Sequence, residues 1–168
     1  GHTPARRLLG RLRTRRERWT ELDTLLADEL ERAVSPARRA AICFRRGELA
    51  ERRLERCDDA IAHYGSALSH AADFRPALRA LGRVFASQGR HEELIQTLEQ
   101  QLAVATDREE RLSLLLRVAQ TWESQLGDPM AALTAYERLL AIEPGHLVAL
   151  RALHRLYAAG GRCADLVE

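Results

Sequence analysis

One residue type, arginine, recurs along this chain at a spacing that would suit the recognition of carboxylate groups. Five arginines follow one another at nearly regular intervals: Arg7, Arg45, Arg79, Arg117 and Arg151. At three of these positions a second arginine follows one helical turn later: Arg11, Arg83 and Arg155. Residues four apart lie on one face of a helix, and a guanidinium can donate two parallel hydrogen bonds to a carboxylate. We therefore predict that these arginines form a ladder that binds an acidic segment or a C-terminal carboxylate of another protein.

The same pattern has a second interpretation, in which the arginines only face solvent. Two like charges four residues apart cost about 0.2–0.5 kcal/mol in an isolated helix, which is small enough to persist if a duplication copied them. Glu48, Glu51 and Glu123 lie nearby and could neutralise the arginines. The chain contains no lysine, so arginine is frequent throughout. Both interpretations are open at the level of sequence.

Composition argues against most other chemistries. Lys and Arg (26) nearly balance Asp and Glu (24), for a net charge of +2, which is not typical of a dedicated nucleic-acid binder. Binding of RNA or another nucleic acid by the same arginines is the alternative function, although it favours aromatic side chains beside the basic ones. Cys43, Cys57 and Cys163 are not spaced as metal ligands or a redox motif, and no phosphate loop or nucleophile elbow occurs. We predict no enzyme activity, no metal and no cofactor.

The sequence contains a long internal repeat. Residues 39–96 match residues 111–168 without a gap at 17 of 58 positions, and such self-similarity indicates a repeat array. Within each copy apolar residues recur every three or four positions, as in amphipathic helices. Asp128 followed by Pro129 is a typical helix start, and Gly89 suits the turn that ends a helix. Each copy is thus predicted to contain two helical hairpins.

The predicted hairpins cover nearly the whole chain. Their approximate bounds are 5–33, 37–71, 75–105, 108–142 and 146–168. Residues 1–4 are predicted to be a tag remnant or a disordered start, and residues 5–168 to form a single repeat domain. Because the pattern starts and stops in mid-repeat, we expect a fragment of a longer array. Its open ends could drive self-association by stacking.

The anchor residues of these hairpins follow a known spacing. Leu78, Leu81, Gly82 and Phe85 have the spacing W-x-x-L-G-x-x-Y, and so do Leu150, Leu153 and Tyr157, with His154 in place of Gly. Ala60 with Tyr64, and Ala132 with Tyr136, have the spacing A-x-x-x-F, and Pro144 follows the second pair. This pattern resembles the tetratricopeptide repeat family, whose first helix carries the first spacing and whose second helix carries the other.

The resemblance implies an all-α fold, a right-handed α-solenoid of about four to five antiparallel helix hairpins with incomplete ends. It implies that the first helix of each hairpin lines a concave groove, which would place the arginine ladder there. The implied function is a protein–protein interaction scaffold that holds a peptide or a partner segment. No apolar run is long enough to span a membrane, and free cysteines without a visible signal peptide favour, by default, a cytoplasmic location.

Overall fold

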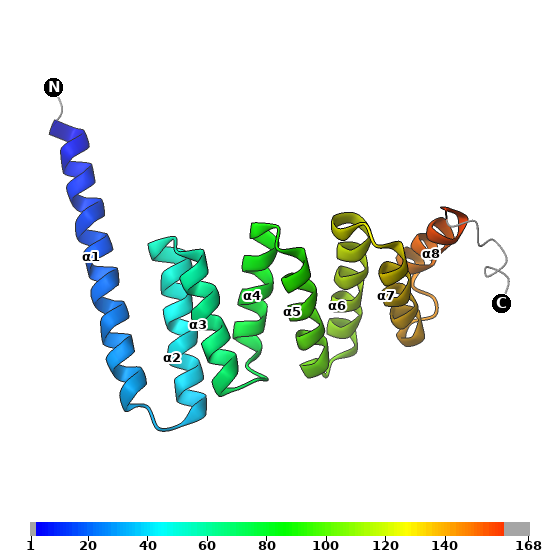
Figure 1. Cartoon of the computed structure of the whole chain (residues 1–168), viewed down its shortest axis with the longest axis horizontal. Helices are drawn as coiled ribbons and strands as arrows, with labels where there is room; N and C mark the ends of the chain where they lie inside the picture. Colours follow the sequence, from blue (N-terminus) through cyan, green and yellow to red (C-terminus); the bar gives the residue numbers. More distant parts are fainter. Residues whose placement is uncertain (1–2, 160–168) are drawn as a thin grey trace. The chain divides into compact units, whose positions relative to one another are not determined.

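The computed structural model describes residues 3–159 of the chain, and the side chains of residues 17–158 within them. The described chain is all-α and contains no strand, which confirms the predicted fold class (Figure 1). Its elements are α1 (Thr3–Arg32), α2 (Pro36–Leu49), η1 (Ala50–Leu54), α3 (Cys57–His70), α4 (Arg75–Gln88), α5 (His91–Val104), α6 (Arg108–Thr121), η2 (Trp122–Leu126), α7 (Pro129–Ile142) and α8 (Leu147–Ala159). The two η elements are short π-helical continuations of α2 and α6.

The chain divides into two compact units, unit 1 (residues 1–84) and unit 2 (residues 85–168), and the division falls within α4. In unit 1, α2 and α3 lie side by side as a helical hairpin, and in unit 2, α6 and α7 do the same (Figure 1). These two hairpins are related by the internal repeat of the sequence. Among the helices of the described residues, none is both long and apolar enough to cross a membrane.

Both hairpins turn in the same way. Each π-helical turn ends at a residue with a left-handed backbone, Glu55 (φ 56°) in unit 1 and Gly127 (φ 65°) in unit 2. Glycine adopts this conformation without strain, whereas a residue with a β-carbon pays about 1 kcal/mol or more. The side chain of Asp128 then accepts hydrogen bonds from two backbone N–H groups of α7, and Pro129 occupies its first turn. The helix start that the sequence predicted at these two residues is therefore confirmed.

The prediction of a hairpin over residues 5–33 is wrong, because α1 is one continuous helix from Thr3 to Arg32. In the repeat register, residues 16–18 correspond to the turn around Gly89, where φ is +69°. Residues 16–18 are Arg-Glu-Arg, which are good helix formers and contain no glycine or proline. Nothing in this segment therefore breaks the helix, and α1 continues through it.

The core of each unit is built around a buried tyrosine. Tyr64 on α3 is 0 % exposed and Tyr136 on α7 is 2 % exposed. One helical turn before each tyrosine lies an alanine, Ala60 or Ala132, which is 0 % exposed. An alanine at these points lets a neighbouring helix approach closely, and the tyrosine ring fills the remaining space between helices. The Ala–Tyr anchors that carried the family resemblance thus help to build the core, whereas Leu150, another anchor, is 42 % exposed.

Candidate functional site

Arg83, one member of the predicted ladder, is held by a carboxylate in unit 1. Its guanidinium donates two hydrogen bonds to Glu51, from Nε to Oε1 (3.1 Å) and from Nη2 to Oε2 (2.8 Å). The hydroxyl of Tyr64 donates a third hydrogen bond to Glu51 Oε2 (2.7 Å). Glu51 follows α2, Tyr64 lies on α3 and Arg83 lies on α4, so this triad joins three helices.

The same triad occurs in unit 2, with every member at the corresponding position of the second copy of the repeat. Arg155 on α8 pairs with Glu123, which follows α6. The hydroxyl of Tyr136 on α7 donates a hydrogen bond to Glu123 Oε2 (2.9 Å). An arrangement that recurs in both copies indicates that these arginines have a structural role, namely to hold successive hairpins in register through a tyrosine-bound glutamate.

The electrostatics of the triads favour one protonation state. Burial of Glu51 opposes its ionisation, but the hydrogen bonds from Arg83 and Tyr64 outweigh this, so the pKa of Glu51 is lowered. Burial and the hydrogen bond to Glu123 together raise the pKa of Tyr136 to about 12. Burial, followed by the hydrogen bond to Glu51, raises the pKa of Tyr64 as well. Glu51 is therefore a charged acceptor between two donors, and both tyrosines stay protonated.

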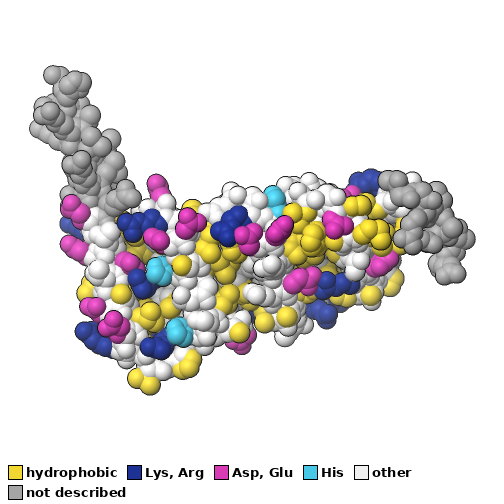
Figure 2. Space-filling view, in the orientation of Figure 1, with side chains coloured by type: hydrophobic (Ala, Val, Ile, Leu, Met, Phe, Trp, Pro, Cys, Tyr) yellow, Lys and Arg dark blue, Asp and Glu magenta, His cyan; other side chains and the backbone are white. Residues whose placement is uncertain are grey.

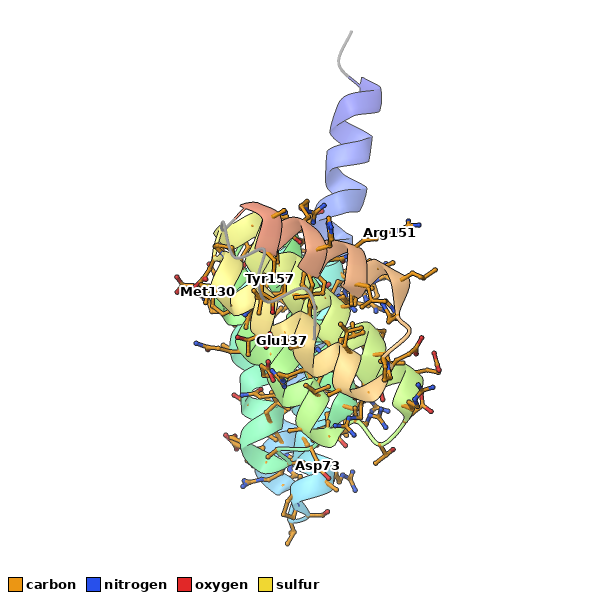
Figure 3. All side chains as sticks on the ribbon, turned by 90° about the vertical axis from the view of Figure 1, so that its right-hand side faces the viewer. Asp73, Met130, Glu137, Arg151 and Tyr157 are labelled. Atoms are coloured by element: carbon orange, nitrogen blue, oxygen red, sulfur yellow. The ribbon has the colours of Figure 1, made fainter. Side chains whose placement is uncertain are left out.

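The remaining ladder residues with described side chains are solvent-exposed: Arg45, Arg79, Arg117 and Arg151. For Arg45, Arg117 and Arg151 no ion pair is found within the part of the chain whose side chains are described. Figure 3 shows Arg151 pointing away from the helices of unit 2, whereas Tyr157 on the same helix donates a hydrogen bond to Glu137 Oε1 (3.0 Å). The side chains of Arg7 and Arg11 lie outside the described residues. Binding of a partner by this set stays a prediction.

A cavity of about 380 Å³ lies beside Arg45, between α1 and the α2–η1 segment of unit 1. Trp19, Leu22 and Leu26 from α1 form its apolar wall, and the guanidinium of Arg53 stacks over the ring of Trp19 at 5.1 Å. The spacing of the leucines in the sequence does not predict this cavity, because their exposure depends on what packs against α1.

On the face shown in Figure 2, arginine side chains lie next to Asp and Glu side chains and do not gather into a large patch of one sign. In unit 2, for example, Arg138 donates two hydrogen bonds to Glu99 (2.7 and 3.0 Å). Among the residues with described side chains, no group of His, Cys, Asp and Glu has the arrangement of a metal site. The face shown in Figure 2 is therefore suited to contacts with individual charged groups.

The helix hairpins, the alanine–tyrosine anchors and the repeated triads define an α-helical repeat fold. Residues 77–112 match the sequence model of the family described as tetratricopeptide repeat. Two solved structures of MamA have the same fold. The first has 17 % sequence identity and a TM-score of 0.55, and the match covers 89 % of this chain and 82 % of the MamA chain. The second has 18 % sequence identity and a TM-score of 0.56, and the match covers 98 % of this chain and 81 % of the MamA chain. None of the curated proteins matches the sequence.

The triads make a prediction about stability and pH. Replacing Glu51 by Gln keeps the shape but removes the charge that orients Arg83 and Tyr64, so we expect a loss of about 1 kcal/mol in the free energy of unfolding. Because the pKa of Glu51 is lowered in the folded state, its contribution is present above its ordinary value of 4.5 and is lost as the pH falls below it.

The measurement is urea denaturation followed by circular dichroism between pH 3 and pH 7. The exposed Glu92 serves as the matched control, and Glu92→Gln should leave stability within about 0.5 kcal/mol of the parent. If Glu51→Gln were as stable as the parent at pH 7, the triad would not hold the hairpins together.

Proposed function

We propose that this chain is a protein–protein interaction scaffold whose exposed arginines bind an acidic segment of a partner. The observation that carries the proposal is the recurrence of one exposed arginine at the same point of α2, α4, α6 and α8. These residues are Arg45, Arg79, Arg117 and Arg151. Helical repeats of this kind present extended surfaces to partners, so a residue that recurs there in every hairpin meets a partner several times.

Each unit offers its own pair of arginines. In unit 1, the hydrogen bonds from Arg83 to Glu51 hold α4 beside the end of α2. Arg79 precedes Arg83 by about one helical turn, and Arg45 lies on the adjacent helix α2. The triad therefore brings the helices that carry Arg45 and Arg79 together on one side of the unit.

Unit 2 repeats this arrangement. The ion pair between Arg155 and Glu123 holds α8 beside the end of α6. Arg151 precedes Arg155 by one helical turn, and Arg117 lies on α6. We assign Arg83 and Arg155 to positioning the helices, and Arg45, Arg79, Arg117 and Arg151 to binding.

An acidic peptide fits this set better than a nucleic acid does. A guanidinium fork matches a carboxylate in shape and charge, and the contact can be bidentate. Nucleic-acid binding favours a stripe of one charge and stacking aromatics. The face shown in Figure 2 mixes both charges, and aromatics are only 5 % of the chain. No catalytic role is proposed.

The test is a titration of fluorescent peptides, acidic or neutral and of equal length, with a single-stranded RNA as a third probe. The variants Arg45→Glu/Arg79→Glu and Arg117→Glu/Arg151→Glu disable one unit each. Arg111 on α6 is exposed and lies on a different side of that helix from Arg117, because the two are not separated by whole helical turns. Arg111→Glu is thus a matched charge control.

We expect the acidic peptide to bind the parent and the control at both units, and each double variant to lose the site of its altered unit, which halves the number of peptides bound per chain. The neutral peptide should not bind. Equal binding of the acidic peptide by the parent and both variants would contradict the proposal. Tighter binding of the RNA than of any peptide would replace it by the nucleic-acid alternative.

A further inference from the structure

The two halves of α1 carry opposite charges. Residues 3–16 contain six arginines and no acidic residue, a net charge of +6. Residues 17–32 contain six acidic residues and two arginines, a net charge of −4. In a single straight helix of 30 residues, which is about 45 Å long, most of the basic half lies too far from the acidic half to neutralise it.

The basic half of α1 also has the sequence of a repeat helix. Residues 3–16 align with α4 (Arg75–Gln88) in the repeat register, and six of the fourteen positions are identical. The identical residues are Pro4, Ala5, Arg7, Leu9, Gly10 and Arg11. The acidic half aligns in the same register with α5 (His91–Val104). Residues 3–16 thus correspond to the first helix of a hairpin, but α1 does not turn back to form one.

The acidic half of α1 has an uncovered apolar face. Leu22 is 38 % exposed and Leu25 is 64 % exposed. Their counterparts on α5, Leu94 and Thr97, are only 5 % and 4 % exposed. Leu22, together with Trp19 and Leu26, also lines the cavity between α1 and the α2–η1 segment. The two positions are thus buried in α5, whereas Leu22 and Leu25 on α1 remain partly exposed among the described side chains.

We propose that a second copy of this chain covers this face, through antiparallel pairing of the two α1 helices. The basic half of each α1 lies on the acidic half of its partner's α1. Because these halves correspond to the first and second helices of a repeat hairpin, the pairing of such a hairpin forms twice in the dimer. A two-fold axis passes near Glu17 and Arg18, and the interface is the same patch on both copies. This pairing needs no turn at residues 16–18, where the sequence provides none.

Charge selects this arrangement over its alternatives. In the antiparallel pair, the half with a net charge of +6 faces the half with a net charge of −4 at both ends. Parallel α1 helices would instead place halves of the same charge against each other. The apolar face around Leu22 and Leu25 supplies the area that is removed from water. The proposal uses α1 alone and does not depend on partner binding by Arg45, Arg79, Arg117 and Arg151.

The experiment is sedimentation equilibrium of the whole chain and of two charge-reversed variants. The basic variant is Glu17→Arg/Glu21→Arg/Asp28→Arg/Glu31→Arg, which changes exposed residues and leaves the ion pairs of Asp23 and Glu29 intact. The acidic variant is Arg6→Glu/Arg13→Glu/Arg15→Glu/Arg16→Glu. Both keep good helix formers in α1, and circular dichroism verifies that the helix content is unchanged.

We expect the parent to be a dimer that weakens with added salt, and each variant alone to be a monomer because its two halves then repel. Mixing the two variants should restore a one-to-one heterodimer, since opposite charges again face each other at both ends. A variant that failed to fold would not be rescued by mixing.

A pair of single substitutions tests the apolar face. Leu22→Glu should abolish the dimer, whereas Val34→Glu, at a residue that follows α1 and is 92 % exposed, should leave it intact. A parent that is monomeric at every attainable concentration would overturn the proposal. So would a dimer that survives in both charge-reversed variants, because it would then form through another surface.

Discussion

Replacing Gly47 by Ala is expected to destabilise unit 1, because overpacking of a core costs about 1–3 kcal/mol. A β-carbon at Gly47 on α2 would lie 2.5 Å from Cδ1 of Tyr64 and closer still to Cε1. The Tyr64 ring cannot easily move, because it is fully buried and its hydroxyl is bound to Glu51. Alanine is the better helix former, but the clash outweighs its gain of about 1 kcal/mol in helix propensity.

Unit 2 shows how the same clash is avoided. The counterpart of Gly47 is Ala119, which is 0 % exposed and lies in the unit that contains Tyr136. In unit 1 the ring of Phe44 packs against Tyr64 at 5.5 Å between centroids, whereas its counterpart in unit 2 is the smaller Leu116. A smaller neighbour gives the tyrosine room to shift away from a β-carbon.

Phe44→Leu should therefore rescue Gly47→Ala. We expect the double variant to be more stable than the sum of the two single effects predicts, by about 1 kcal/mol or more. Urea denaturation of the four proteins of this cycle measures the coupling. Strictly additive effects would show that the Tyr64 ring adjusts without help from position 44.

The second large effect is expected at the ion pair between α1 and α2. Arg46 donates to both carboxylate oxygens of Asp23 (2.7 and 3.2 Å), and the two side chains are only 18 % and 28 % exposed. Asp23→Ile should cost about 2–3 kcal/mol, because it leaves a largely buried arginine without its partner. The counterparts in unit 2 are Ile95 and Val118, which are both buried.

The double variant Asp23→Ile/Arg46→Val copies these apolar residues into unit 1, and we expect it to be at least as stable as the parent. The hydrogen bond from Arg46 lowers the pKa of Asp23 below its ordinary value of 3.8. The contribution of the pair is thus present above pH 3.8 and is lost as the pH falls below it.

Urea denaturation at several pH values checks both points. The double variant should lose less stability than the parent as the pH falls below 3.8. If it were instead as unstable as Asp23→Ile alone, the apolar pair of unit 2 would depend on packing that unit 1 does not provide.

The sequence alone predicted the helices and their repeat, because these depend on local patterns. Apolar residues at three- and four-residue intervals indicated helices, and the internal repeat with the Ala60–Tyr64 spacing indicated tetratricopeptide-like hairpins. The helix start at Asp128 and Pro129 followed from the chemistry of capping. Glu51 and Glu123 were among the carboxylates that could neutralise the arginines, but their actual partners were not known.

Only the tertiary structure decided which arginines pair with the glutamates of the triads. Arg83 and Glu51 are far apart in sequence, and their pairing depends on which helix face meets which neighbour. It also decided that α1 stays straight and that Leu22 and Leu25 are uncovered. The physical reason is the distance along the sequence between the residues that interact. Helix formation depends on residues within a few positions of one another. Burial and ion pairing depend on the packing of whole helices, which spacing in the sequence does not specify.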